Sequence, residues 1–246
     1  MGARFEELDS RASPIGEISL RRRRAPASDV DVYEIKLGDE YLMSSLFTAS
    51  EIALARRGMA AVAAGASPPP GGVDLVVGGL GLGYTAAAAL EDDTLRSMVV
   101  VELLGAVIDW HASGLLPLGP GLTADPRCRL VQGDFFALAD SAGGLDAAAP
   151  GRLFHAILVD IDHSPDALLD DRSAGFYRPE GLRRMAGHLH PGGVFGLWSN
   201  ERPDAAFTAR LAAVFADAWA EPVVFANPLQ DQPFTQTIYL ARTASA

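Results

Sequence analysis

The sequence has a single cysteine, Cys128, in 246 residues. One cysteine excludes an internal disulfide and any metal site built from several cysteines, and it favours a reducing compartment. No apolar run reaches the roughly 18 residues that a membrane span needs. The N-terminal residues also lack the apolar core of a signal peptide. We therefore expect a cytoplasmic protein that has no membrane partner.

Basic residues are also few, since 20 Lys and Arg stand against 31 Asp and Glu, a formal net charge of −11. Such a chain repels phosphate backbones, so we expect no nucleic-acid partner. The run Arg21–Arg24 does not change this, because side chains alternate between the two faces of a strand and form no single basic stripe. Net negative charge serves solubility in most proteins, and it also suits a cationic small molecule.

A run of proline and glycine at residues 67–72 divides the chain, because it suits neither a helix nor a central strand. Before it, alternating apolar residues predict strands near residues 17–21, 33–37 and 41–46. Residues 48–51 have the spacing of a capping box, which predicts that a helix starts there. We expect an N-terminal β-rich domain with one helix over residues 1–66 and a second domain over residues 67–246.

After this run, short apolar segments alternate with helical ones. The strands are expected near residues 75–77, 98–101, 129–131, 156–159 and 194–197. This order predicts a parallel sheet with helices on both faces. Residues 223–225 and 237–240 predict an antiparallel pair at one edge. The expected fold class is α/β, with a Rossmann-like, mostly parallel sheet, an antiparallel C-terminal hairpin and a small antiparallel β-domain in front.

A glycine-rich turn follows the first strand of this second part and leads into a helix. Its glycines are Gly78, Gly79, Gly81 and Gly83. Glycines here allow a tight turn and a close approach of the backbone to a ligand, and they serve packing as well. Glu102 ends the next strand at the spacing, about 20 residues, of an acid that binds ribose hydroxyls. A nucleotide site is therefore predicted.

Asp134 ends the third strand, and Phe135 follows it. The carboxylate is a candidate to accept a hydrogen bond from an adenine amino group, and the ring of Phe135 or Phe136 is a candidate to pack on the base. The other interpretation of Asp134 is a helix N-cap. The glycines at 79, 81 and 83 do not have the Gly-x-Gly-x-x-Gly spacing of an NAD(P) site. With Gly-Asp after the third strand, they resemble the class I S-adenosylmethionine fold.

Five segments carry a further likeness. They are Ser-Pro-Ile-Gly-Glu-Ile at 13–18, Gly78-Gly79, Phe-His-Ala-Ile-Leu-Val-Asp at 154–160, Phe176-Tyr177, and Leu-His-Pro-Gly-Gly-Val at 189–194. On these segments, the chain resembles the spermidine synthase (polyamine aminopropyltransferase) family over nearly its whole length. The resemblance implies a donor that is S-adenosylmethionine or its decarboxylated form, a small amine acceptor and no metal. It also implies a homodimer or tetramer.

The catalytic aspartate of that family corresponds to Asp160, and Asp162 and His163 are the next candidates. A sulfonium is already a good leaving group, so the protein must mainly align the amine and accept its proton. Trp198, at the end of the fifth strand, is a candidate wall of the acceptor pocket or a core residue. The other interpretation of residues 160–166 is an acidic loop that caps a helix.

The sequence departs from the family at two places. Gly81 stands where the family has the aspartate that binds the aminopropyl amine, and a three-residue step from Asp160 reaches His163 instead of a second aspartate. Before the nucleotide domain, Glu51 is the only acid near the expected acceptor residues. Two alternatives stay open: methyl transfer from intact S-adenosylmethionine to a small molecule, and a non-catalytic nucleotide-binding homologue.

Overall fold

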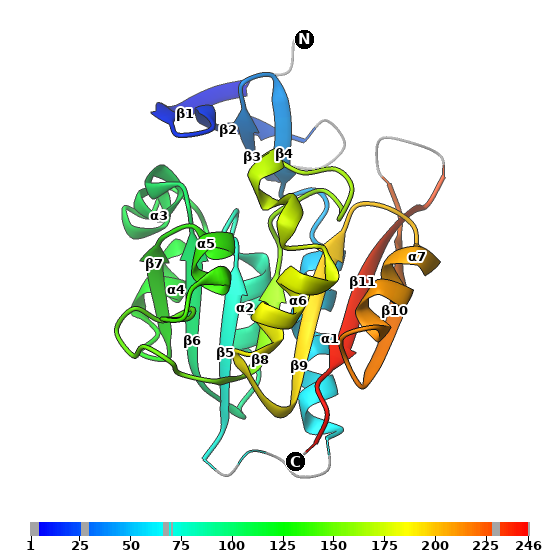
Figure 1. The fold of residues 1–246 in the computed structure, drawn as a ribbon. Coiled ribbons are helices and arrows are strands. Elements are labelled where there is room, and N and C mark those ends of the chain that lie inside the picture. The colour runs from blue at the N-terminus through cyan, green and yellow to red at the C-terminus, as the bar shows by residue number, and fades with distance from the viewer. Residues whose placement is uncertain (1–4, 26–29, 66–68, 70, 228–231, 246) are drawn as a thin grey trace.

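Two sheets of different construction stand one above the other in the computed structural model (Figure 1). The structure describes residues 5–25, 30–65, 69, 71–227 and 232–245. The predicted domain boundary at 66/67 and most of the proline run lie outside these residues. The smaller sheet lies over the end of the larger sheet where the strands β5, β6 and β8 finish (Figure 1).

The smaller sheet is antiparallel and has the order β1-β2-β3-β4. Its strands are β1 (Phe5–Ser13), β2 (Gly16–Arg24), β3 (Asp31–Leu37) and β4 (Glu40–Ser44). The last three are the predicted strands, and β1 was not predicted. Arginines of β2 pair with acids of the neighbouring strands, as in Arg22 with Glu6 and Arg23 with Glu34. The arginine run therefore forms ion pairs across the smaller sheet.

The larger sheet has the order β10-β11-β9-β8-β5-β6-β7. Its strands are β5 (Val73–Gly78), β6 (Leu95–Glu102), β7 (Cys128–Gln132), β8 (Phe154–Val159), β9 (Leu189–Ser199), β10 (Asp217–Phe225) and β11 (Phe234–Arg242). The five strands from β9 to β7 are parallel, and β11 runs antiparallel to both β9 and β10. The predicted α/β fold with an antiparallel C-terminal hairpin is confirmed.

Helices cover both faces of this sheet. They are α1 (Ala49–Ala63), α2 (Tyr84–Leu90), α3 (Gly105–Ala112), α4 (Gly119–Ala124), α5 (Phe135–Asp140), α6 (Pro179–Ala186) and α7 (Ala205–Ala212), with a 3-10 turn at Asp171–Gly175. Alternate residues of each strand enter one of two cores. Val77 and Leu158 pack with α1 to α4, and Val76 and Ile157 pack with α5 to α7. In the described part of the chain, no helix is long and apolar enough to cross a membrane.

Helix α1 follows the smaller sheet in the chain but packs on the larger one. Its buried side begins at Ser50 and Glu51, continues through Leu54 and Ala55, and lies against α2, β8, β9 and β11. The predicted capping box is wrong, because the side chain of Thr48 makes no capping hydrogen bond. Glu51 does not reach back to the cap, because the first turn of α1 faces the interior. Helix α1 thus carries an acidic side chain to the point where the two sheets meet.

Candidate donor and acceptor site

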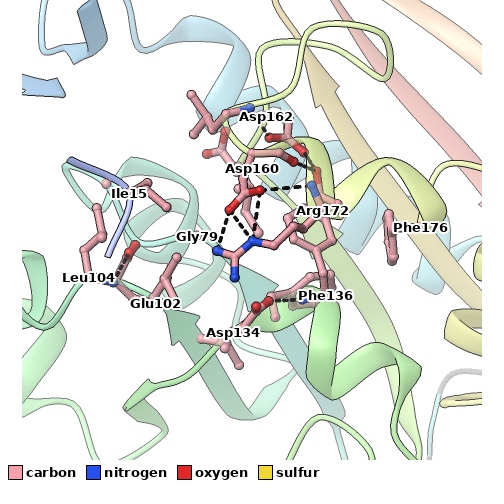
Figure 2. Close-up of a pocket in the computed structure, with 18 of the residues that line it drawn as sticks. Ile15, Gly79, Glu102, Leu104, Asp134, Phe136, Asp160, Asp162, Arg172 and Phe176 are labelled. Carbon is pink, nitrogen blue, oxygen red and sulfur yellow. Dashed lines mark hydrogen bonds and ion pairs between the residues drawn. The ribbon is translucent and has the colours of Figure 1, made fainter. Parts of the chain in front are cut away.

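A cavity of about 400 Å³ opens where the strands β5, β6 and β8 end beneath the smaller sheet. Figure 2 shows Gly79, Glu102, Asp134 and Asp160 around it. Ligands of open α/β sheets bind at this end of the strands. Apolar side chains of the smaller sheet and of its β1–β2 turn close the cavity from above; they are Ile15, Ile18, Ile35, Leu42 and Met43.

The glycine turn forms one wall of the cavity with Gly79 and Gly81. Gly79 has φ +91°, and a Cβ there would collide with the carbonyl oxygen of Asp160. Gly81 has φ +46°, and a Cβ would lie 2.8 Å from the sulfur of Met43. That sulfur also accepts a hydrogen bond from the backbone N–H of Leu82 at 3.1 Å. The turn therefore lies between β8 and β4, and a side chain at position 81 requires a strained backbone and a shift of Met43.

Two of the predicted glycines, Gly78 and Gly83, are not part of the cavity wall. Gly78 is the last residue of β5, and the ring of Phe135 occupies the space where its Cβ would stand. Gly83, with φ +91°, caps the N-terminus of α2 and packs on Leu122 and His111. Neither lines the cavity. Both shape the turn that carries Gly79 and Gly81.

Glu102 lies at the end of β6 with only 8% of its surface exposed. Its Oε2 accepts a hydrogen bond from the backbone N–H of Leu80 at 2.9 Å, and its Oε1 accepts one from Leu104 at 2.8 Å. Burial raises the pKa of this carboxyl, and the backbone N–H groups oppose that rise. Glu102 thus ties the glycine turn to the end of β6, and its carboxyl group lines the cavity.

Asp134 is the N-cap residue of α5. Its Oδ1 accepts hydrogen bonds from the backbone N–H groups of Phe136 at 3.0 Å and Ala137 at 3.1 Å. The capping interpretation is therefore present in the structure, and the same side chain lines the cavity. Phe135 and Phe136 both line the cavity; Phe135 is 2% exposed and packs under Gly78, whereas Phe136 is half-buried.

Asp160 directly follows β8 and points into the cavity (Figure 2). Its Oδ2 accepts a hydrogen bond from the hydroxyl of Thr85, in the first turn of α2, at 2.6 Å. Burial raises the pKa of Asp160 to about 6, and the Thr85 hydrogen bond opposes the rise. A carboxyl with this pKa is ionised at neutral pH and is basic enough to accept a proton.

Glu51 of α1 lines the same cavity, and the sequence offered no role for it. The hydroxyl of Thr85 lies 3.3 Å from the backbone oxygen of Glu51 and binds Asp160, so α1 and β8 meet at this threonine. Burial, and then the charge of Asp160, raises the pKa of Glu51 to about 8, against the hydrogen bond with Ser50. The structure thus brings two acidic side chains, 109 positions apart in the sequence, to one place.

Asp162 and His163 take part in holding the loop that covers the cavity. Asp162 is 2% exposed, accepts the N–H of Leu169 at 2.8 Å through Oδ1, and accepts the hydroxyl of Tyr177 at 2.7 Å through Oδ2. Nε2 of His163 lies 3.0 Å from a carboxylate oxygen of Glu40, at the start of β4. The hydrogen bonds of Asp162 fix the loop after β8. The contact between His163 and Glu40 joins this loop to the smaller sheet.

The cavity wall has more acidic than basic side chains. Its two arginines, Arg172 and Arg184, are paired with Asp170 and Asp140. Trp198 of β9 also lines the wall and donates from Nε1 to the hydroxyl of Ser50 at 2.8 Å. Among the described residues, no group of three or more His, Cys, Asp or Glu side chains is placed to hold a metal ion. The arrangement suits a ligand that carries positive charge.

No protein-family model matches the chain. Among solved structures, the chain is similar to a spermidine synthase in complex with the transition-state analogue AdoDATO, with 18% identity and a TM-score of 0.72. It is similar at 18% identity and a TM-score of 0.70 to spermidine synthase from Thermotoga maritima. Both matches cover 98% of this chain and 74% of the other.

A third similar structure is human methyltransferase-like protein 13 in complex with SAH. It is 18% identical, has a TM-score of 0.53, and the match covers 79% of each chain. At these identities the likeness concerns the fold. The chain has a spermidine-synthase-like fold, which agrees with the predicted resemblance.

Proposed function

We propose that the protein is a transferase that binds an adenosyl-sulfonium donor and alkylates a small cationic amine, with Asp160 as the general base. The observation that carries this proposal is the cavity itself. Carboxyl groups from three strand ends, Glu102, Asp134 and Asp160, line it opposite a glycine turn. Ligands bound by solved structures of similar fold, AdoDATO and SAH, support an adenosyl compound as the ligand.

The donor is placed by the groups that recognise its parts. We assign the ribose hydroxyls to Glu102, because its carboxyl group lines the cavity at the end of β6 and a carboxylate accepts hydrogen bonds from hydroxyls. We assign the adenine amino group to Oδ2 of Asp134, because Oδ1 serves the helix cap. The half-buried ring of Phe136 is then the surface for the base. The sulfur lies near Gly79 and Asp160 in this placement.

The reaction needs one proton transfer. The acceptor ammonium gives a proton to the ionised carboxylate of Asp160, and the resulting amine attacks the carbon next to the sulfonium. The new C–N bond forms as the C–S bond breaks. The electron pair of the C–S bond stays on the sulfur, and the rest of the donor leaves as a neutral thioether. The product is a secondary ammonium, and Asp160 releases its proton to solvent. The hydrogen bond from Thr85 holds the carboxylate in place for this transfer.

A second candidate function is methyl transfer from intact S-adenosylmethionine to a small molecule. One observation favours it: Gly81, packed on Met43, leaves the glycine turn without an acid. A carboxylate on the tail of the donor would therefore meet no like charge on that turn. The third alternative, a nucleotide-binding protein without turnover, uses the same donor contacts.

The test is a calorimetric titration with S-adenosylmethionine, its decarboxylated form and methylthioadenosine. Tighter binding of the decarboxylated form supports aminopropyl transfer, and tighter binding of the intact form supports methyl transfer instead. If none of the three binds, the donor site is wrong. Binding of a donor without any product by mass spectrometry, over a panel of small amines, would favour the non-catalytic alternative.

A further inference from the structure

Glu51 is a buried carboxyl group whose position the proposed reaction does not yet use. Only 6% of its surface is exposed. A buried carboxylate is costly unless a cation or several hydrogen bonds compensate for the lost water. No lysine, arginine or histidine among the described residues forms an ion pair with it. Its side chain contacts the hydroxyl of Ser50 at 2.7 Å and the backbone N–H groups of Ser50 and Glu51, and these contacts do not offset the burial that raises its pKa. Its protonation state therefore needs an explanation.

The hydrogen bonds around Ser50 show which partner brings the hydrogen. A serine hydroxyl has one hydrogen to donate. Nε1 of Trp198 donates to Ser50, and Oε1 of Gln236 lies 2.5 Å from it. Because Nε2 of Gln236 donates to Asn200, its Oε1 is an acceptor and takes the serine hydrogen. The contact with Glu51 then has a hydrogen only if the carboxyl of Glu51 supplies it. A protonated Glu51 therefore gives every contact of Ser50 a hydrogen, whereas an ionised Glu51 leaves Ser50 with two acceptors and one hydrogen.

The groups that face Glu51 from the neighbouring elements agree with a protonated state. After β8 comes Asp160, whose charge acts on Glu51. From α2 comes the phenol of Tyr84, which also interacts electrostatically with Glu51. Strands β9 and β11 contribute the uncharged Trp198 and Gln236. Two carboxyl groups in one buried site, with no cation paired to either in the described residues, cannot both be ionised without a large cost.

We infer that Glu51 and Asp160 share one proton, and that Glu51 sets the charge that faces the sulfur of the donor. This inference rests on the proposed function, because it needs the donor in the cavity. Glu51 acts through Asp160 and is a positioning residue. While Glu51 is protonated, Asp160 is free to be the ionised base. When a cation occupies the cavity, Glu51 gives its proton to solvent, and the cavity then has two negative charges in place of one.

A pair of ligands that differ only at the sulfur tests the inference. S-adenosylmethionine has a permanent positive charge there, and S-adenosylhomocysteine has none. The ratio of their dissociation constants, measured by calorimetry from pH 6 to pH 8.5, reports the negative charge near the sulfur. In the wild type, we expect the preference for the sulfonium to rise about tenfold over this range, an effect typical of one added charge a few ångströms away.

The variant Glu51→Gln keeps the shape of the protonated side chain and cannot ionise. We expect its preference for the sulfonium to change less than about threefold over the same range. The matched control is Glu201→Gln, an exposed glutamate outside the cavity wall, which should follow the wild type. Titration of the ligands themselves is the same for all three proteins and cancels in the comparison. If the donor is decarboxylated S-adenosylmethionine, the matched neutral ligand is decarboxylated S-adenosylhomocysteine.

Each outcome decides one of the two proposals. A preference that is independent of pH in the wild type, or that rises equally in Glu51→Gln, overturns the shared proton and leaves the donor site intact. If the wild type binds none of the four ligands in the two pairs, the proposed function is overturned, and the inference with it. As a check that needs no variant, titrations of the wild type at pH 7 in buffers of different ionisation heat should show proton release with the sulfonium and none with the thioether. Equal release for both contradicts the inference.

Discussion

The donor side and the reacting side of the cavity hold their acids in different ways. On the donor side, Glu102 and Asp134 accept hydrogen bonds from backbone N–H groups, which only donate. On the reacting side, Asp160 and Glu51 contact the hydroxyls of Thr85 and Ser50. A hydroxyl donates or accepts and turns to suit its partner. The donor side is therefore built to hold a fixed pattern of acceptors, and the reacting side to tolerate a change of protonation.

The largest expected difference between the two sides is in turnover. Asp160→Asn removes the proton acceptor, so we expect the rate of product formation to fall by about 10²–10⁴-fold, the range for loss of a general base. Affinity for the neutral thioether that the reaction releases should change less than about threefold, because the donor-side contacts remain and no charge at the sulfur is involved. Rates come from mass spectrometry of the product and affinities from calorimetry.

The matched control is Asp166→Asn, an exposed aspartate on the same loop that does not line the cavity. Its rate should equal that of the wild type. Unchanged turnover in Asp160→Asn would remove this residue from the mechanism. The reacting side would then have no role in proton transfer that the donor side lacks.

The next effect concerns stability and pH. Glu51 has its ordinary pKa of 4.5 when unfolded and about 8 when folded, so the folded state binds more protons between these values. The free energy of unfolding therefore falls as pH rises through this window. Between pH 6 and pH 8, above the pKa of Asp160, we expect Glu51→Gln to gain about 2 kcal/mol relative to the wild type.

Urea denaturation without ligand at the two pH values measures this gain. Glu201→Gln should show no pH-dependent difference from the wild type. If Glu51→Gln and the wild type lose stability in parallel from pH 6 to pH 8, Glu51 is already ionised at pH 6 and the reacting side is no different from the donor side.

A smaller effect is expected on the donor side. Asp134→Asn keeps a good helix cap, so the free energy of unfolding should change by less than about 0.5 kcal/mol. The amide can turn its NH₂ group toward the adenine amino group, so we expect donor affinity to fall by about three- to tenfold, equally at pH 6 and pH 8. A loss of affinity that varies with pH would contradict the fixed acceptor pattern, and calorimetry at the two pH values would detect it.

The same comparison explains what the sequence could predict. The donor side follows from local patterns, because Glu102 and Asp134 come directly after apolar strands whose ends meet in any parallel sheet. The strand β1 was missed because most of Phe5–Ser13 is exposed and shows no clear apolar alternation. The five predicted parallel strands and the C-terminal pair were found because each contains a short run of apolar residues.

The reacting side depends on packing between distant segments. Glu51 reaches Asp160 only because α1 packs on the larger sheet, and Met43 reaches Gly81 only because β4 lies over the glycine turn. Neither contact has a signature in spacing or composition. The capping box at residues 48–51 was predicted from spacing alone, and the burial of the first turn of α1 overrode it. Tertiary packing therefore decides the side of the cavity where the chemistry is proposed.

The central claim is that this cavity binds an adenosyl-sulfonium donor through Glu102. The most direct measurement is a calorimetric titration of the wild type and Glu102→Gln with S-adenosylmethionine and its decarboxylated form, with a thermal melt to show that the variant is folded. We expect the wild type to bind at least one of them, and the variant to bind it about 10- to 100-fold more weakly, because hydrogen bonds to a charged acceptor are lost. Absence of binding to the wild type, or equal binding to both proteins, would contradict the account.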